Sequence, residues 1–189
     1  MQNVSLGFEG RTLIAEFSLS VSPGDRIAIV GPNGSGKTTL FNAISGALAC
    51  RDGLVRRPGH VVVSRSYQQP LWISGALRDK LQASSIDETR FRQYMGVFGV
   101  SGDVFDRDLA TFSQGQLKKV DLCRSMMTDA DILLWDEPLN YVDLYSREQL
   151  ETAISLYDPT MLFIEHDRAF VEKVATEIVF LGDFVPADA

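Results

Sequence analysis

The residues best suited to chemistry form a glycine-rich run, GPNGSGKTT, which extends from Gly31 to Thr39. It fits the pattern G-x-x-x-x-G-K-[ST] and stands between the apolar run RIAIV and a helical pattern from Thr38 to Leu48, the setting that this motif requires. Glycines let successive backbone N–H groups turn toward a phosphate, and a helix start adds the positive end of its dipole. The run predicts a cradle for nucleotide phosphates, with a chance glycine-rich turn as the alternative.

Two side chains of this run have separate tasks. Lys37 is placed to bring a point charge to the β and γ phosphates, which makes it a catalytic as well as a binding residue, and Thr38 to offer a hydroxyl to Mg²⁺. The phosphate-binding residues that the motif predicts are Gly31, Pro32, Asn33, Gly34, Ser35, Gly36, Lys37, Thr38 and Thr39.

A pair of acids follows a second apolar run, in the sequence ILLWDEP. At the end of a parallel strand, Asp136 and Glu137 would lie at the sheet edge where such folds bind ligands. We expect Asp136 to hold Mg²⁺ through water and Glu137 to polarise the water that attacks the γ-phosphate. Alone, the pair would fit a turn or helix cap before Pro138 better; the upstream phosphate motif favours the catalytic interpretation.

The surrounding pattern indicates the elements that must position these residues. Short β-rich runs come first (VSLGF, RTLIAEFSLSV), and the apolar strands RIAIV, VVV at 61–63, DILLW, TMLFI and EIVFL then alternate with helical patterns. We expect helices at 86–98, 114–127 and 147–157, and a short one before EIVFL. The pattern predicts an α/β fold: a mostly parallel sheet flanked by helices, an N-terminal β layer and a small helical subdomain.

Composition excludes several classes of protein. The 189 residues, 45% hydrophobic and 23% charged, suit one globular domain. No run reaches the roughly 18 apolar residues that span a bilayer, the two cysteines have no metal-site spacing, and the N-terminus has no export pattern, so we expect a cytoplasmic protein. A net charge of −7 argues against a broadly basic nucleic-acid surface and DNA binding, although Arg51, Arg56 and Arg57 could form a local patch.

The stretch FSQGQLKKVDLCRSM, directly before the acidic strand, resembles the LSGGQ signature of ABC ATPases. Further matches follow in the order of that family. The resemblance places Gln68 in the Q-loop, as a catalytic residue and a ligand of Mg²⁺, Asp143 in the D-loop, and His166 as the switch histidine. It also places Phe8 where an aromatic ring stacks on adenine.

Each of these residues also has an interpretation without a functional role. Gln68 and His166 could lie in solvated loops, and Phe8 could be a core residue of the β layer. His60 has no comparable setting and receives no role.

The signature carries a further implication. In this family its face contacts the ATP of a second ABC ATPase domain, so two domains in a head-to-tail dimer sandwich two nucleotides. The resemblance therefore assigns the partner's site to Ser113, Gln114, Gly115, Gln116 and Asp143, with Ser113 as a helix N-cap. A plain helix start is the alternative. Gln114 replaces a glycine of the family pattern, which affects how closely the loop can approach phosphate.

The sequences DEPLNYVDLYSREQLETAI and YDPTMLFIEHDRAFVEKVATEIV resemble the second ATPase domain of ABC-F proteins of the antibiotic-resistance type. This branch implies a soluble two-domain ATPase that acts on the ribosome, of which this chain would be an excised domain. The alternatives are the ATPase subunit of a membrane transporter and an ATP-occupancy switch with little turnover. Lys118 and Lys119 are either a basic contact near the signature or a solvated helix face.

Within the domain, the resemblance and the element pattern predict a core of residues 1–68 and 128–189. A helical subdomain of about 70–127 carries the signature.

Overall fold

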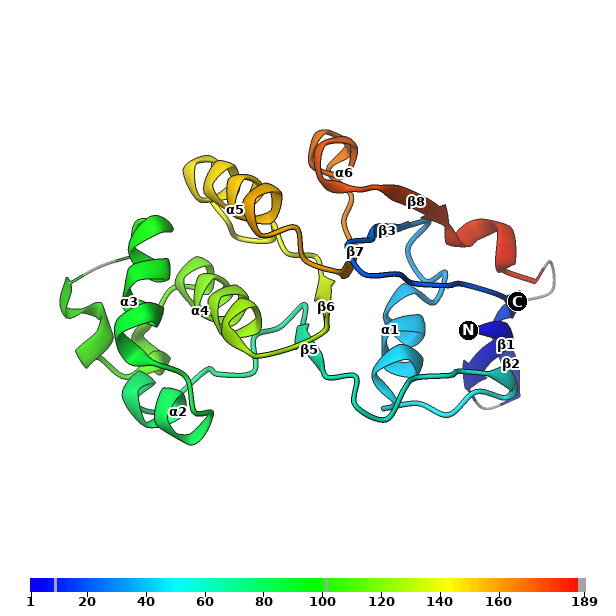
Figure 1. The fold of residues 1–189 in the computed structure, drawn as a ribbon, viewed down its shortest axis with the longest axis horizontal. Coiled ribbons are helices and arrows are strands. Elements are labelled where there is room, and N and C mark those ends of the chain that lie inside the picture. The colour runs from blue at the N-terminus through cyan, green and yellow to red at the C-terminus, as the bar shows by residue number, and fades with distance from the viewer. Residues whose placement is uncertain (9, 101, 187–189) are drawn as a thin grey trace.

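A five-stranded parallel sheet lies at the centre of the computed structural model, which describes residues 1–8, 10–100 and 102–186 (Figure 1). In spatial order the strands are β5 (Val63–Ser66), β6 (Ile132–Asp136), β7 (Met161–Ile164), β3 (Arg26–Val30) and β8 (Glu177–Phe180). All four pairings are parallel. The carboxyl ends of these strands therefore meet at one edge, where the predicted phosphate and acidic motifs follow β3 and end β6.

Helices and a second sheet cover this centre on both faces. The antiparallel sheet consists of β2 (Arg11–Phe17), β1 (Gln2–Phe8) and β4 (Asp52–Leu54) in spatial order. The helices are α1 (Lys37–Ser45), α2 (Leu77–Ala83), α3 (Glu88–Val97), α4 (Gln114–Met127), α5 (Leu144–Tyr157) and α6 (Arg168–Val174). Short 3-10 turns occupy Gly102–Asp106, Leu109–Thr111 and Leu181–Phe184. Figure 1 shows α1 and the small sheet on one side of the parallel sheet and α2, α3 and α4 on the other.

The parallel sheet divides the apolar side chains into two clusters. Successive side chains along a strand point to opposite faces of the sheet. On β3, Ile27 and Ile29 join the cluster with α1 and the small sheet, whereas Ala28 joins the helical cluster. Likewise Leu134 of β6 faces α1, and Trp135 faces the helices. The three inner strands, β6, β7 and β3, are buried on both sides, which explains their nearly continuous apolar sequences.

The expected fold class is confirmed, with corrections at several element ends. The helix expected from Thr38 to Leu48 ends at Ser45, because Gly46 adopts a φ of 83° and its N–H bonds the carbonyl of Ala43. The helix expected from Arg147 begins at Leu144, where Asp143 caps it. The strand expected at 61–63 instead covers Val63–Ser66. Helix 114–127 matches its prediction.

No helix within the described ranges is long and apolar enough to cross a membrane.

Candidate nucleotide-binding site

The phosphate loop joins β3 to α1 at the carboxyl edge of the sheet. Gly34 and Gly36 adopt φ values of 80° and 92°, which side chains with a Cβ rarely allow. A Cβ added to Gly36 would lie 3.0 Å from Ile14 of β2, so the loop also packs tightly against the small sheet. No side chain caps the start of α1, which leaves its first N–H groups open to an anion.

One buried polar atom of this loop fits an anionic ligand. The Ser35 hydroxyl oxygen is buried and has no hydrogen-bond partner among the described residues. Buried polar atoms are normally paired, so an unpaired hydroxyl beside open helix N–H groups suits a phosphate oxygen. The loop geometry therefore agrees with the predicted phosphate cradle.

Lys37 lies over the loop with its ammonium turned back toward the backbone. Its Nζ donates to the carbonyl oxygens of Gly31 and Pro32, each at 2.9 Å. Burial lowers the pKa of Lys37, while the nearby Glu137 and Asp136 carboxylates raise it. The ammonium is thus held where the loop would receive phosphates.

Thr38 and Asp136, which the sequence predicts to be ligands of magnesium, lie in contact with each other. The Thr38 hydroxyl donates to Oδ2 of Asp136 at 3.1 Å, and Asp136 is 2% exposed. Burial raises the pKa of Asp136, against the effects of the Thr38 hydrogen bond and the Arg65 charge. The described residues contain no cluster of three or more His, Cys, Asp or Glu that could hold a metal. A hydroxyl, one carboxylate and nucleotide phosphates nevertheless suit Mg²⁺, which keeps several waters.

Glu137 meets two amide side chains beyond the end of β6. Its Oε2 accepts hydrogen bonds from Nε2 of Gln68 at 2.9 Å and from Nδ2 of Asn140. Glu137 has a φ of 50°, an uncommon conformation that is often found at functional sites. His166 Nε2 lies 3.9 Å from Oε1 of Glu137. The structure therefore brings together three residues that the sequence separates by up to 98 positions (166 minus 68).

The signature segment begins α4 with the expected cap. The Ser113 hydroxyl accepts from the Gln116 N–H at 3.2 Å, and the Gln116 side chain accepts from the Ser113 N–H at 2.9 Å. These reciprocal bonds form a capping box. A Cβ on Gly115 would lie 2.6 Å from the carbonyl oxygen of Tyr141, so only glycine fits there. Gln114 is exposed.

Asp143 has structural partners within the chain. It accepts from the Ser146 N–H at 2.9 Å as the cap of α5, and its Oδ2 lies 2.6 Å from Nζ of Lys119. The Lys119 hydrogen bond holds the pKa of Asp143 well below its ordinary value. Asp143 thereby joins the segment after β6 to the signature helix.

The structure corrects both interpretations of Lys118 and Lys119. Lys118 is 0% exposed, and its Nζ donates to the carbonyl oxygens of Tyr67 and Asp136. The Lys119 side chain, 12% exposed, bonds Asp143 and the carbonyl of Phe98. Neither forms a basic surface or a solvated helix face.

Phe8 lies at the end of β1 and is 48% exposed, so it is not a core residue of the β layer. It pairs with Arg11 at the start of β2, the strand that packs against the phosphate loop through Ile14. A half-exposed ring at the end of this strand pair is compatible with stacking on a base.

Sequence reasoning missed Arg65, Asn42 and Asn140. Arg65, 7% exposed, donates to Oδ1 of Asn42 at 2.6 Å, lies 3.8 Å from Oδ2 of Asp136 and stacks over the Tyr67 ring. Burial lowers the pKa of Arg65, partly offset by Tyr67 and Asp136. An arginine inside a short strand gave no periodic signal. Asn140 follows Glu137 by three residues, a spacing from which a side-chain contact with Glu137 could have been predicted.

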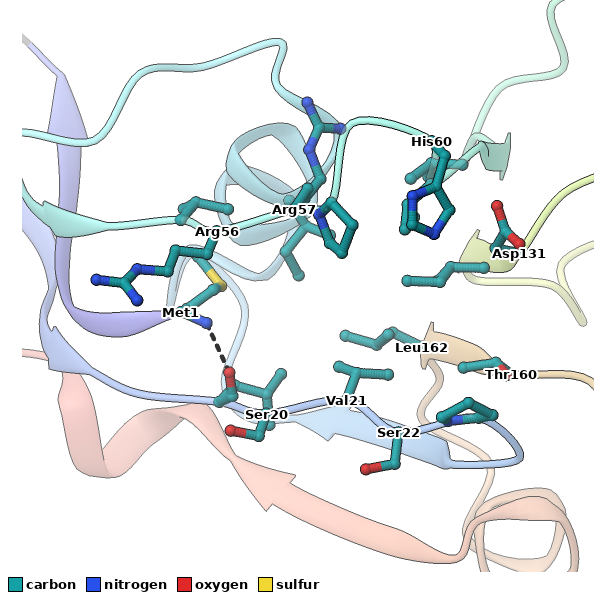
Figure 2. A pocket seen from close by; sticks show the side chains of 18 of the residues that line it. Met1, Ser20, Val21, Ser22, Arg56, Arg57, His60, Asp131, Thr160 and Leu162 are labelled. Carbon is teal, nitrogen blue, oxygen red and sulfur yellow. Dashed lines mark hydrogen bonds between the residues drawn. The ribbon is translucent and has the colours of Figure 1, made fainter.

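A cavity of about 540 Å³ lies away from this site (Figure 2). It opens at the amino ends of the parallel strands, beside Asp131, Thr160 and Ser22. Figure 2 shows Arg56 and Arg57 on its border with their guanidinium groups directed away from the hollow. Nη1 of Arg57 donates to the carbonyl of Ser45 at 3.0 Å and so supports the end of α1. Within the predicted patch of Arg51, Arg56 and Arg57, the Arg57 side chain thus stabilises the end of α1.

Residues 14–140 match the family model described as ABC transporter. The chain therefore belongs to the ABC transporter family. A solved structure of the ATP-binding subunit of an ABC transporter superposes with a TM-score of 0.81 at 20% identity, over 96% of this chain and 85% of that chain. That likeness shows the fold: an ABC ATPase domain.

Curated relatives define the branch more closely. The chain is 33% identical to ribosome protection protein VmlR of Bacillus subtilis (strain 168) and 30% identical to ABC transporter F family member 5 of Arabidopsis thaliana. Each match covers 97% of this chain, but only 34% and 27% of the respective relative. The resemblance to ABC-F proteins is thereby confirmed, and the chain spans about a third or less of these relatives.

Proposed function

We propose that this chain binds MgATP at the phosphate loop and hydrolyses ATP with Glu137 as general base. The observation that carries the proposal is the convergence of Gln68, Glu137 and His166, from three different strand ends, beside the Thr38–Asp136 pair. A base, its orienting groups and a magnesium pair in one place are what phosphoryl transfer to water requires.

Each side chain has a separate task in this scheme. The Glu137 carboxylate accepts a proton of the attacking water, while Gln68 and Asn140 fix its orientation through their amide bonds. His166, 50% exposed, is placed to donate a hydrogen bond to the γ-phosphate. When bound, Mg²⁺ would supply charge neutralisation at the phosphate oxygens, and Thr38, Asp136 and Gln68 are the residues that would hold it.

A second ABC ATPase domain completes each site in this proposal. The residues assigned to the nucleotide of the partner are Ser113, Gln114, Gly115 and Gln116 at the start of α4, and Asp143, which caps α5 and is bonded to Lys119 of α4. Their contacts within the chain are backbone caps and one ion pair, which leave Gln114 exposed at the helix start. The N–H groups of the first turn that the capping box does not bond can receive an anion from another subunit.

We further propose that the parent protein is a cytoplasmic ABC-F ATPase that acts on the ribosome, with this chain as its second ATPase domain. The name of VmlR, a ribosome protection protein, supports this role, since the relative matches nearly the whole chain. The division into a core and a helical subdomain of about 70–127 stays a prediction.

Gln114 favours a second candidate, an ATP-occupancy switch that turns over slowly. Its exposed amide side chain stands at the position where the family has glycine. A side chain there would keep the signature loop farther from the phosphates of the partner and weaken hydrolysis more than binding.

Glu137→Gln tests the proposed function. Isothermal titration should give an ATP affinity within about 3-fold of wild type, whereas hydrolysis should fall by roughly 100-fold or more because a general base is lost. Size-exclusion chromatography with ATP should show more dimer, because ATP that is not hydrolysed keeps the two domains closed around it. Unchanged hydrolysis would remove Glu137 from the mechanism.

The branch assignment needs a cellular measurement. Expressed from its own gene, the Glu137→Gln protein should co-sediment with ribosomes when ATP is present. Co-purification with a membrane protein instead would favour the transporter subunit and contradict the ribosomal proposal, while leaving the ATPase assignment in place.

A further inference from the structure

Lys118 is an unusual residue because its charged group is enclosed within the domain. It lies on α4, four residues after the helix starts, and none of its surface is exposed. Its ammonium bonds two main-chain oxygens, that of Tyr67 at 2.9 Å and that of Asp136 at 3.1 Å. The ammonium therefore joins α4 to the ends of β5 and β6.

The contacts of this ammonium are not those of a simple ion pair. Within the described residues, no carboxylate lies within 4.0 Å of Lys118 Nζ as a salt-bridge partner. The nearby Asp121 carboxylate is already bonded by the Ser66 hydroxyl at 2.7 Å and by Arg124. Burying a charge is costly, and a methionine of equal length would fill the same space without that cost. The hydrogen bonds to the two carbonyls are thus what the ammonium specifically provides.

Both carbonyls directly precede proposed catalytic residues. Tyr67 is followed by Gln68, and Asp136 is followed by Glu137. The side chains of Gln68 and Glu137 then meet at 2.9 Å. The two chain segments at the water-activating end of the site are therefore joined twice. The Lys118 ammonium joins their main chains, and the hydrogen bond between Gln68 and Glu137 joins their side chains.

We propose that Lys118 is a positioning residue for ATP hydrolysis, which fixes Gln68 and Glu137 relative to each other by holding the carbonyl groups before them. This inference rests on the proposed hydrolytic function. Because Lys118 lies one turn after the signature loop, it also ties the helix that faces the partner's nucleotide to the catalytic end of this chain's own site. Movement of α4 would be transmitted to both catalytic segments together.

Lys118→Met separates positioning from binding. Methionine preserves length and apolar volume but donates no hydrogen bond, so kcat should fall by roughly 10- to 100-fold, as expected when reacting groups shift by about 1 Å. The phosphate loop is untouched, so the affinity for ATP by titration, and KM, should stay within about 3-fold. Lys118→Arg restores donors and should recover most of kcat. Lys173→Met, which removes a 61% exposed ammonium bonded to Glu151, is the matched control and should leave kcat unchanged.

Hydrogen exchange followed by mass spectrometry gives a readout that does not depend on turnover. In Lys118→Met without nucleotide, the amides of residues 67–69, 136–137 and 139–140 should exchange at least about 10-fold faster, and those of α5 and β2 at the wild-type rate. Unchanged exchange in the two segments would overturn the proposal, as would a general acceleration that shows a merely structural role. If wild type proves inactive, the proposed function fails while this exchange test still decides the positioning of the segments.

Discussion

The phosphate loop and the signature segment, the two regions that we propose to face anions, differ in how many side chains the chain itself gathers around them. At the phosphate loop, Lys37, Thr38 and Asp136 already contact one another or the loop backbone, and Glu137 is held by two amides. At the signature, Ser113 and Gln116 bond only each other's backbone, and Gln114 is exposed. The first region is preorganised within the chain, whereas the second offers a helix start with no catalytic side chain gathered around it.

From this difference we expect binding and turnover to depend on different parts of the molecule. In the proposed scheme a nucleotide finds its phosphate contacts in one chain, because the loop, Lys37 and the Thr38–Asp136 pair all lie there. Efficient hydrolysis in this scheme also needs a partner that brings a second signature. Perturbing each region should therefore change a different observable.

Lys37→Met should have the largest effect, on the first region. It removes the ammonium over the loop, and loss of a charge-assisted contact to phosphate should weaken ATP binding roughly 100-fold, or about 2.7 kcal/mol. Isothermal titration in Mg²⁺ measures the affinity, and a thermal melt checks that the fold is retained. An unchanged affinity would contradict the assignment of the cradle.

Gly115→Ala perturbs the second region alone. The new Cβ would meet the Tyr141 carbonyl at 2.6 Å and displace the signature loop. We expect steady-state hydrolysis to fall by about 10-fold or more, with ATP affinity of the isolated chain unchanged. Gly59→Ala is the control, because nothing lies within 4 Å of its added Cβ. If Gly115→Ala weakened ATP binding as much as it lowered hydrolysis, the two regions would not be separable.

Gln114→Gly should sharpen the comparison in the opposite direction. Removing the exposed side chain lets the helix start approach a partner's phosphate more closely, so we expect hydrolysis to rise a few-fold. The cost is a flexible residue in the first turn, about 0.5–1 kcal/mol of stability. Turnover per chain, measured as a function of protein concentration, is the test; a fall in turnover at saturation would reject the occupancy-switch interpretation of Gln114.

A smaller effect concerns the link between α5, which follows Asp143, and α6, which follows His166. Arg147 bonds Glu151 and both oxygens of Asp167. Although burial raises the pKa of Glu151, its bonds to Arg147 and Lys173 lower it overall. The hydrogen bonds that Asp167 accepts from the Phe170 N–H and from Arg147 lower the pKa of Asp167. Because their pKa values are lowered in the folded state, these two carboxylates stabilise the fold at pH values above their ordinary pKa values of 4.5 and 3.8. This stabilisation is lost as the pH falls through their pKa values in the folded state.

Arg147→Met should accordingly reduce the free energy of unfolding by about 1–2 kcal/mol at pH 7, and by much less in acid. Urea titrations at several pH values measure this. The control, Arg78→Met, breaks a pair whose arginine is 63% exposed and should leave stability nearly unchanged. A difference for Arg147→Met that persists in acid would show that packing, not charge, holds α5 to α6.

Much of the fold could be predicted from local sequence. The helix from Gln114 to Met127 has a serine cap, a glutamine three residues later and apolar residues at helical spacing, and each of these signals lies within the helix or next to it. The phosphate loop was equally predictable, because its glycines and lysine are adjacent in sequence.

Strand β5 shows why prediction failed elsewhere. Apolar valines indicated 61–63, but the strand includes Ser64, Arg65 and Ser66, which are 3%, 7% and 0% exposed. Their burial is possible because Ser64 bonds Ser125, Arg65 bonds Asn42 and Ser66 bonds Asp121. These partners lie 23 to 61 positions away, so periodicity contains no information about them. The burial of Lys118 escaped prediction for the same reason.

The division of the apolar interior by the parallel sheet has a consequence for how the domain can vary. Side chains next to each other on one strand, such as Leu134 and Trp135, belong to different cores and share few neighbours. Changes on opposite faces should therefore combine additively, whereas changes on the same face should be coupled. The apolar packing of the helical face can therefore vary with little effect on the α1 face, which holds the phosphate loop. The limit to this variation is α4, where Lys118 must keep its bonds to the carbonyl groups at the ends of β5 and β6.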